Sequence, residues 1–184
     1  VGTAPQDLKY NNEPTKIIIG DDCIIRESVT LNRGTLSRGF TSIGRGCLFM
    51  AYSHVAHDCV IGNNVIMANC ATLAGHVEVS DSVIIGGLAA IHQFVRIGRF
   101  SMVGGGAMVV LDVPPFCQTQ GDRAKLVGLN IVGLKRHGFT EQQVRDIKSA
   151  YKTIFTSGLM VAEAINQLHT AKPSNEIKEF TDFI

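Results

Sequence analysis

Between residues 43 and 114 the chain places an apolar residue at every sixth position. The hexads begin at twelve residues, all of them apolar: Ile43, Phe49, Val55, Ile61, Met67, Leu73, Val79, Ile85, Ile91, Ile97, Val103 and Val109. The second position is Gly, Ala or Ser in nine hexads, and the fifth is only Cys, Ser, Val or Ala. A period of six keeps the two-residue period of a strand but drifts off the period of a helix. The pattern predicts short strands joined by tight corners.

Three such strands close one coil of 18 residues. Large apolar residues at the first position and small ones at the fifth can fill a narrow prism, while small second positions relieve crowding at the corners. Stacked coils share a core that no single hexad can bury. A parallel α/β sheet would need amphipathic crossovers, and residues 43–114 contain none. We therefore expect a mainly β protein, with a parallel β-helix over residues 1–115.

The phase of the repeat also locates the coils and one interruption. The expected coils are 19–36, 43–60, 61–78, 79–96 and 97–114. Residues 37–42 form an extra hexad without an apolar first residue, and we expect a loop there. Since the phase continues back to residue 1 and bare strand edges promote aggregation, we expect further coils upstream or another segment that covers the first coil.

After Pro114 and Pro115 the pattern becomes helical, which predicts a C-terminal helical domain over residues 116–184. Thr140 and Gln143 have the spacing of a capping box, and apolar residues follow at helical intervals as far as Gly158. Further helices are expected over 160–170 and after Ser174. We expect these helices to pack against the last coils and hide a sheet edge.

Composition narrows the classes of function. The chain has 184 residues, 45% of them hydrophobic and 18% charged, and its formal net charge is +1. This near-neutral charge argues against general nucleic-acid binding. No apolar run is long enough for a transmembrane helix, and no signal peptide is visible. Three of the five cysteines occupy the small fifth position of a hexad, as apolar fillers, and an odd total without secretory features favours a reducing cytoplasm.

Three of the six histidines fall on one predicted corner of the prism. His57, His76 and His92 lie at nearly the same offset in three successive coils, so they should form a column. Asp58 and Gln93 follow two of them. A single polar residue at a corner is ordinarily just solvated, but three histidines on consecutive rungs indicate a function.

These histidines are compatible with two kinds of chemistry. An imidazole can act as a general base near neutral pH. Several imidazoles converging on one point can instead bind zinc with an open position for water. His54 and His57 lie close in sequence, but the sequence alone does not tell whether they converge.

Specific strings in the chain resemble a known family. The hexads themselves resemble the left-handed β-helix of hexapeptide acyltransferases, and seven strings are similar to the UDP-N-acetylglucosamine O-acyltransferase family. These strings are Q-D-L-K-Y (6–10), I-R-E-S-V-T (25–30), H-V-A-H-D-C (54–59), A-T-L-A-G-H (71–76), I-I-G-G (84–87), H-Q-F (92–94) and G-L-K-R-H-G-F (133–139). The hexads are shared by many transferases, whereas the histidine-containing strings in this order are much more specific.

The resemblance implies an enzyme that moves a 3-hydroxyacyl chain from acyl carrier protein to the 3-hydroxyl of UDP-N-acetylglucosamine, the first step of lipid A synthesis. It implies a homotrimer with each active site between neighbours, and neither cofactor nor metal. By this resemblance His57 is the general base, Asp58 supports its imidazole, and the Gly75 N–H stabilises the oxyanion.

The resemblance also implies a set of substrate contacts. The sugar and acyl groove would be lined by Asp7, Lys9, His54, His76, Gly87, His92 and Gln93. Asn130 and Arg136 would contact the nucleotide, and a guanidinium suits phosphate geometry. Gly105 would set the acyl length, and a bare glycine should admit a longer chain.

The chain departs from this family's usual pattern at three positions, which leaves alternatives open. Asn32, Val132 and His137 stand where histidine, glutamate and arginine are common. An acceptor amine would make the enzyme a related N-acyltransferase, although such a sibling should lack the G-L-K-R-H-G-F string. A zinc-dependent γ-class carbonic anhydrase shares the fold. A non-catalytic prism should show threonine-rich faces, and threonine is scarce in these hexads.

Overall fold

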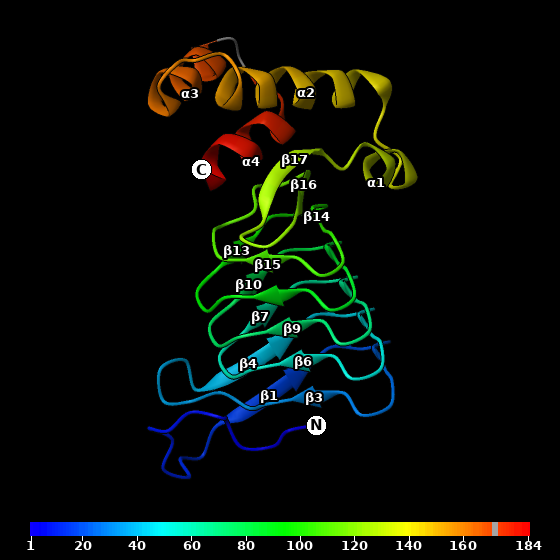
Figure 1. Ribbon diagram of the computed structural model, residues 1–184, viewed down its shortest axis with the longest axis vertical. Coiled ribbons are helices and arrows are strands. Elements are labelled where there is room, and N and C mark those ends of the chain that lie inside the picture. Colours follow the sequence, from blue (N-terminus) through cyan, green and yellow to red (C-terminus); the bar gives the residue numbers. More distant parts are fainter. Residues whose placement is uncertain (171–172) are drawn as a thin grey trace.

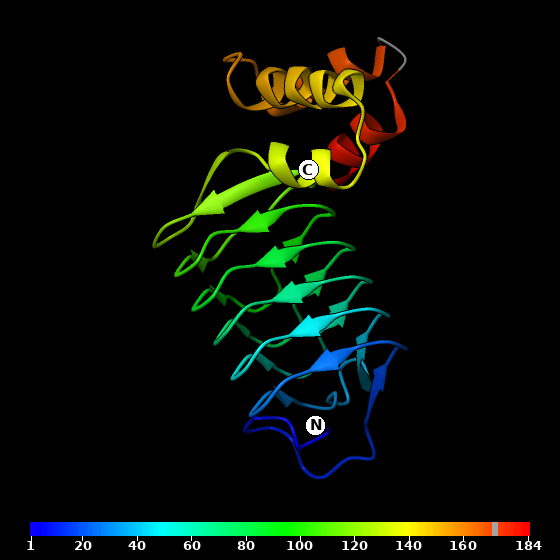
Figure 2. The same cartoon turned by 90° about the vertical axis from the view of Figure 1, so that its right-hand side faces the viewer.

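The computed structural model, described over residues 1–170 and 173–184, is a left-handed parallel β-helix whose C-terminal end is covered by helices (Figure 1). The prism is long and narrow, and Figure 2 shows its coils stacked one above the other. The expected fold class is confirmed.

Three sheets form the sides of the prism, and their strands are parallel except for β17. Sheet 1 contains β1 (Lys16–Ile19), β4 (Phe40–Ile43), β7 (Val60–Ile61), β10 (Glu78–Val79) and β13 (Arg96–Ile97). Sheet 2 contains β2 (Ile24–Ile25), β5 (Leu48–Phe49), β8 (Ile66–Met67), β11 (Ile84–Ile85), β14 (Met102–Val103), β16 (Cys117–Gln120) and β17 (Lys125–Leu129). Sheet 3 contains β3 (Thr30–Leu31), β6 (His54–Val55), β9 (Thr72–Leu73), β12 (Ala90–Ile91) and β15 (Met108–Val109).

The hexad pattern corresponds to the core of the prism. All twelve first residues of the hexads are buried, none with more than 3% of its surface exposed. The fifth positions are buried as well, from Cys47 to Val113. Equivalent residues pair directly between coils, for example Ile43 with Ile61 and Val79 with Ile97. Burial of this ladder supplies the hydrophobic free energy that holds the coils together.

The corners of the prism use a repeated backbone conformation. At the fourth position of successive hexads φ is positive even where the residue is not glycine, as at Asp58 (59°), His76 (64°) and Phe94 (67°). At the second position there is no room for a side chain on several rungs. A Cβ on Gly44 would lie 2.6 Å from the carbonyl oxygen of Gly62 in the next coil. Small residues at this position are therefore required by the stacking of the corners.

We name each corner by the two sheets that it joins. The 1–2 corner leads from sheet 1 to sheet 2, and the 2–3 corner leads from sheet 2 to sheet 3. The 3–1 corner contains residues 32–39, 56–59, 74–77, 92–95 and 110–113 on successive coils.

The prediction of a loop over residues 37–42 is partly wrong. Strand β4 begins at Phe40 and pairs over its whole length with β1, so that Phe40 lies opposite Lys16. The chain leaves the coil earlier, and the excursion is residues 33–39 at the 3–1 corner. The hexad phase misplaced the loop because both strands are four residues long, twice the length of the other strands in sheet 1.

The end of the repeat at Pro115 is not the end of the sheet. Strand β16 continues sheet 2 beside β14, and β17 returns antiparallel to it. Helical structure begins only at Ile131 with α1 (Ile131–Arg136). The expected change to helix directly after Pro115 is wrong, because two further strands come first. The apolar pattern gave no sign of these strands or of the short helix that follows them.

The remaining helices agree with expectation and cover the end of the prism (Figure 1). Helix α2 (Glu141–Phe155) begins with the capping box of Thr140 and Gln143, followed by α3 (Val161–Thr170) and by α4 (Asn175–Phe183) with Ser174 as its N-cap. Phe180 of α4 is fully buried, with its ring 6.3 Å from that of Phe116 below it.

Over residues 1–170 and 173–184, none of the helices combines the length and the apolar character that crossing a membrane would require.

Candidate active site

The three histidines of the expected column do lie on the 3–1 corner, but at different positions of it. His57 occupies the third position of its hexad, His76 the fourth and His92 the second. The residue stacked above His57 is therefore Gly75. The His92 side chain is exposed, and its Nδ1 lies 3.1 Å from the carbonyl oxygen of Gln93. The column is thus a pair of contacting histidines with His92 above it.

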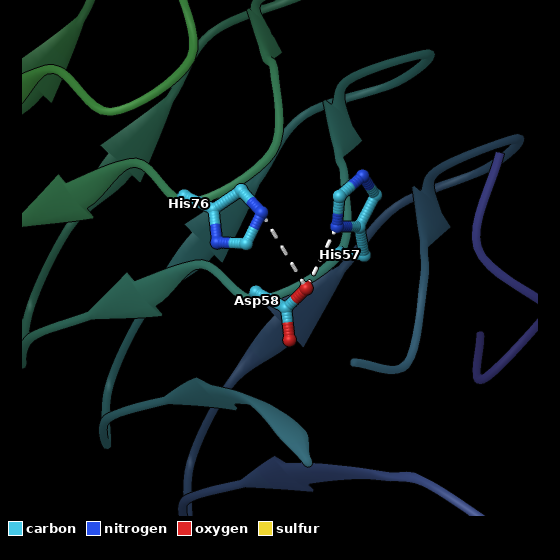
Figure 3. Close-up of side chains that lie close together, drawn as sticks. All are labelled: His57, Asp58 and His76. Atoms are coloured by element: carbon cyan, nitrogen blue, oxygen red, sulfur yellow. Dashed lines mark hydrogen bonds and ion pairs between the residues drawn. The ribbon is translucent and has the colours of Figure 1, made fainter. Parts of the chain in front are cut away.

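His57, Asp58 and His76 form the centre of this corner (Figure 3). Nδ1 of His57 lies 2.8 Å from Oδ2 of Asp58, and Nε2 of His76 lies 3.8 Å from the same oxygen. The two imidazoles meet edge to face with their centroids 5.1 Å apart. The outer face of His76 stacks on Phe94 at 4.6 Å. Only 14% of the His57 side chain is exposed, so its ring is held by its neighbours.

The Asp58 carboxylate is fully buried and bound at both oxygens. Oδ1 accepts a hydrogen bond from the Thr35 backbone N–H (2.9 Å), and Oδ2 accepts one from the Thr35 hydroxyl (2.6 Å). Burial alone would raise the pKa of this carboxyl, but the hydrogen bonds from Thr35 and His57 outweigh burial and hold the pKa below its usual value. Asp58 is therefore an anion that only accepts hydrogen bonds.

The charge state of Asp58 determines the tautomer of His57. Because the carboxylate only accepts, Nδ1 of His57 must carry the proton in the bond between them. Nε2 of a neutral His57 then carries the lone pair. This arrangement gives an imidazole that is oriented by an anion on one side and is free to take a proton on the other.

Gly75 lies directly against the His57 ring. A Cβ at residue 75 would come within 2.6 Å of Cε1 and 2.8 Å of Nε2 of His57. Among the described residues, the Gly75 N–H donates to no acceptor, although its carbonyl accepts from Phe94. A free backbone donor thus lies beside the basic nitrogen, as an oxyanion site requires.

Gly75→Ala should disable the site without unfolding the coil. The new methyl group must displace the His57 ring, and misplacing a reacting group by about 1 Å can cost about 100-fold in rate. We expect a fall in kcat of that order in a transfer assay, with an unchanged circular dichroism spectrum. Gly44→Ala, which would crowd the Gly62 carbonyl at the 1–2 corner, is the matched control. It should lower Tm instead, and a Gly75→Ala variant with normal kcat would contradict the predicted contact.

A cleft of about 350 Å³ opens beside His76. The N-terminal segment forms one side of it and the excursion after β3 forms the other. Its lining residues are Asp7, Lys9, Tyr10, Glu13, Thr35, Leu36, Ser37 and His76. The structure therefore brings together three of the residues expected to line a sugar site, namely Asp7, Lys9 and His76.

Other expected groove residues lie away from this cleft. His54 points outward from sheet 3, where burial lowers its pKa and its Nδ1 lies 2.7 Å from the Thr30 hydroxyl. Gly87 and Gly105 are neighbours on the 2–3 corner, at the opposite edge of sheet 3. A Cβ on Gly105 would lie 3.3 Å from the Gly87 carbonyl oxygen. A ligand that used both corners would have to run across sheet 3.

The two expected nucleotide contacts lie at the C-terminal end of the prism. Asn130 is buried as the N-cap of α1, since its Oδ1 accepts from the Gly133 N–H and its Nδ2 donates to the Phe100 carbonyl. Arg136 is exposed in the last turn of α1. The adjacent His137 packs on Phe100, which belongs to the 1–2 corner. Arg136 and His57 therefore do not share a corner within one chain.

The central cluster also resembles a metal site. One ligand atom from each of His57, Asp58 and His76 lies within 4.8 Å of the others. Zinc enzymes use three such ligands. However, Oδ2 of Asp58 already accepts from Thr35 and His57, and a metal would have to replace both hydrogen bonds. The bonding fits an oriented base better than a metal centre.

Two residues that contact Asp58 were missed from the sequence. Thr35 binds the carboxylate of Asp58, and the Thr41 hydroxyl accepts from its backbone N–H at 2.8 Å. Both lie at or beside the interruption of the hexads. The position of that interruption, one coil below His57 on the same corner, is the signal that could have identified them.

Two family models match the chain. The model described as Udp N-acetylglucosamine O-acyltransferase, domain 2, matches residues 112–184, and the model described as bacterial transferase hexapeptide (six repeats) matches residues 40–75.

Relatives of known name and structure match over the whole chain. An acyl-[acyl-carrier-protein]–UDP-N-acetylglucosamine O-acyltransferase of Anaeromyxobacter is 52% identical and covers 100% of this chain, which spans 72% of the relative. The UDP-N-acetylglucosamine acyltransferase structure from Campylobacter jejuni is 43% identical with a TM-score of 0.95, and the alignment covers 100% of this chain and 71% of that one. The corresponding structure from Bacteroides fragilis is 38% identical with a TM-score of 0.96 and covers 100% and 72%.

Proposed function

Because the chain belongs to the UDP-N-acetylglucosamine O-acyltransferase family, we propose that it transfers an acyl chain from acyl carrier protein to UDP-N-acetylglucosamine, with His57 as the general base. The observation that carries the proposal for His57 is its pairing with the buried Asp58 anion beside the free N–H of Gly75. The acyl chain is a 3-hydroxyacyl group and the acceptor is the 3-hydroxyl of the sugar, which makes this the first step of lipid A synthesis.

The reaction needs only groups of the protein and its substrates. Nε2 of His57 takes the proton of the sugar hydroxyl as its oxygen attacks the thioester carbonyl. The Gly75 N–H donates to the oxyanion of the tetrahedral intermediate. Collapse of the intermediate breaks the carbon–sulfur bond, and the imidazolium returns its proton to the departing thiolate. Asp58 stabilises the imidazolium while it exists. The products are the ester and the free thiol of the carrier protein.

The cleft beside His76 is the proposed sugar site. Asp7 accepts from sugar hydroxyls, and Lys9 can donate to them across the same cleft. The acyl chain runs across sheet 3, past His54, towards Gly87 and Gly105 on the 2–3 corner. His92 and Gln93 are exposed on the rung above His76 and border this path.

The outward faces of the sheets support a homotrimer. Sheet 2 presents an in-register aliphatic ladder, which consists of Ile24, Leu48, Ile66, Ile84 and Met102. Sheet 1 presents Glu78 and Arg96 instead, as expected for a solvated face. Sheet 2 of one copy packing on sheet 3 of the next closes a ring. This packing places the 1–2 corner of one copy beside the 3–1 corner of its neighbour, so Arg136 from one copy serves the His57 site of the next.

A direct assay tests the transfer and the acyl-length proposal together. The purified protein is incubated with UDP-N-acetylglucosamine and with carrier proteins that bear 3-hydroxyacyl chains of different length. We expect ester formation with a preference for one length. Stoichiometric zinc in the purified protein, together with carbon dioxide hydration and no ester, would instead support a carbonic anhydrase.

Gly105→Met should shift this preference to shorter chains. Residue 105 is exposed, and a Cβ there meets only the backbone of Gly87, so a longer side chain can extend into the acyl path. We expect the ratio of kcat/KM for long and short acyl donors to fall by at least about 10- to 200-fold, the range for a single methylene in an apolar pocket. Gly105→Ala should change the ratio much less, and an unaltered preference in Gly105→Met would place the end of the acyl path elsewhere.

A further inference from the structure

The carboxylate of Asp58 is held mainly by one residue from a different coil. Thr35 donates its backbone N–H to Oδ1 and its hydroxyl to Oδ2, so a single residue engages both oxygens. Thr35 is itself buried. A carboxylate bound at both oxygens cannot rotate about its last side-chain bond, and its Oδ2 remains directed at Nδ1 of His57.

The excursion that carries Thr35 is anchored on both sides. Before Thr35, the Arg33 guanidinium donates to the Tyr10 hydroxyl (2.6 Å) and to the Gly2 carbonyl (3.2 Å). After it, Arg38 forms an ion pair with Glu78 of β10 at 2.6 Å. The Thr35 carbonyl also accepts from the Gly39 N–H at 2.7 Å, which closes the excursion on itself. The backbone of Thr35 is thus fixed from the N-terminal segment and from β10, two strands beyond β4 in sheet 1.

We infer that Thr35 is a positioning residue, which acts through Asp58 to fix the orientation and tautomer of the His57 base. This inference rests on the proposed function of His57. The hydroxyl of Thr35 and Nδ1 of His57 share Oδ2, so the strength of one hydrogen bond depends on the other. If the hydroxyl is removed, the carboxylate loses its fixed plane, and Oδ2 is no longer held towards Nδ1 of His57.

The other charged groups around the pair are few and bind other partners. His76 from the next coil faces Asp58, Arg38 and Glu78 pair with each other beside it, and Asp7, Lys9 and Glu13 lie across the cleft. None of them donates to Oδ1 or Oδ2 within hydrogen-bonding distance among the residues that the structure describes. No neighbour therefore substitutes for Thr35.

Thr35→Val is the decisive variant, because it keeps the backbone N–H and the shape but removes the hydroxyl. We expect kcat to fall about tenfold, with KM for UDP-N-acetylglucosamine little changed. The acidic limb of the pH–rate profile should move to lower pH, because a carboxylate that is not held towards Nδ1 stabilises the imidazolium less. Thr35→Ser restores the hydroxyl and should recover the kcat and the pH profile of the wild type.

Thr41→Val is the matched control. Thr41 is also buried, and it contacts the backbone of Asp58 rather than its carboxylate. Its replacement should lower Tm while the pH–rate profile keeps its wild-type position. A shift of the profile in Thr41→Val as large as in Thr35→Val would show that packing around Asp58, and not the hydroxyl, is responsible.

Nitrogen NMR of the histidine rings tests the inference independently of the reaction. In the full-length wild type, His57 should be protonated at Nδ1 when neutral, and Thr35→Val should give a mixture of tautomers. This readout remains valid if no acyl transfer is found, so failure of the proposed function and failure of the role of Thr35 can be told apart. A wild-type tautomer and pH profile in Thr35→Val would overturn the inference, as would equal defects in Thr35→Ser and Thr35→Val.

Discussion

His57→Ala should reduce kcat by about 10³-fold, within the range that a positioned general base contributes. The variant removes the imidazole whose basic nitrogen lies beside Gly75 and which the Asp58 anion orients. The readout is ester formation from 3-hydroxyacyl-loaded acyl carrier protein and UDP-N-acetylglucosamine, measured at saturating concentrations of both. Binding of the sugar nucleotide, measured by calorimetry, should be largely preserved.

His92→Ala is the appropriate comparison for this variant. His92 lies on the same corner but is exposed and is not in contact with Asp58. Its loss should raise KM more than it lowers kcat, while both variants should keep the wild-type Tm. Undiminished kcat in His57→Ala would eliminate His57 as the base and move attention to His76, which also lies near Asp58.

A mixture of two inactive variants should regain activity if the site is shared between copies. Arg136→Ala should lose nucleotide binding, because the guanidinium binds phosphate with charge and geometry that alanine lacks. When Arg136→Ala and His57→Ala chains are refolded together, a mixed ring contains one site with both groups intact. Random mixing should restore about a quarter of the wild-type rate, since about three quarters of the trimers are mixed and one site in three is intact.

The control for this experiment uses two changes on the same corner. His57→Ala mixed with Asp58→Asn should stay inactive, because no arrangement of copies then gives an intact His57–Asp58 pair. Sedimentation should show trimers in every sample. If the mixture with Arg136→Ala also stayed inactive while mixed trimers formed, Arg136 would not act on the neighbouring copy.

The sequence alone predicted the prism because its repeat is enforced by packing at every rung. Each first and fifth position fills the interior, so any deviation would create a cavity or an overlap, and the apolar pattern records this directly. The same holds for the capping box of Thr140, whose signal is local. The pairing of His57 with its neighbour Asp58 was also accessible, since it joins adjacent residues.

Contacts that depend on corner geometry could not be predicted in this way. The prediction of a vertical column of histidines was wrong because the three residues occupy different positions of their hexads. On a tight corner, side chains at adjacent positions point in different directions. Gly75 therefore stacks directly above His57, and His76 meets the His57 ring from the side. Thr35 was missed because its contact with Asp58 comes from an irregular excursion that has no periodic signal. Strands β16 and β17 escaped notice because they are not part of the six-residue repeat.

The Thr35–Asp58 contact has a consequence for folding as well. Because successive coils are nearly identical in their interior, a chain that slipped by one whole coil during folding would still bury aliphatic side chains against one another. Such a misaligned state would leave the Asp58 carboxylate buried without its donors, which costs several kcal/mol for an uncompensated charge. The residues that prepare the base thus also mark the correct alignment of an otherwise repetitive molecule.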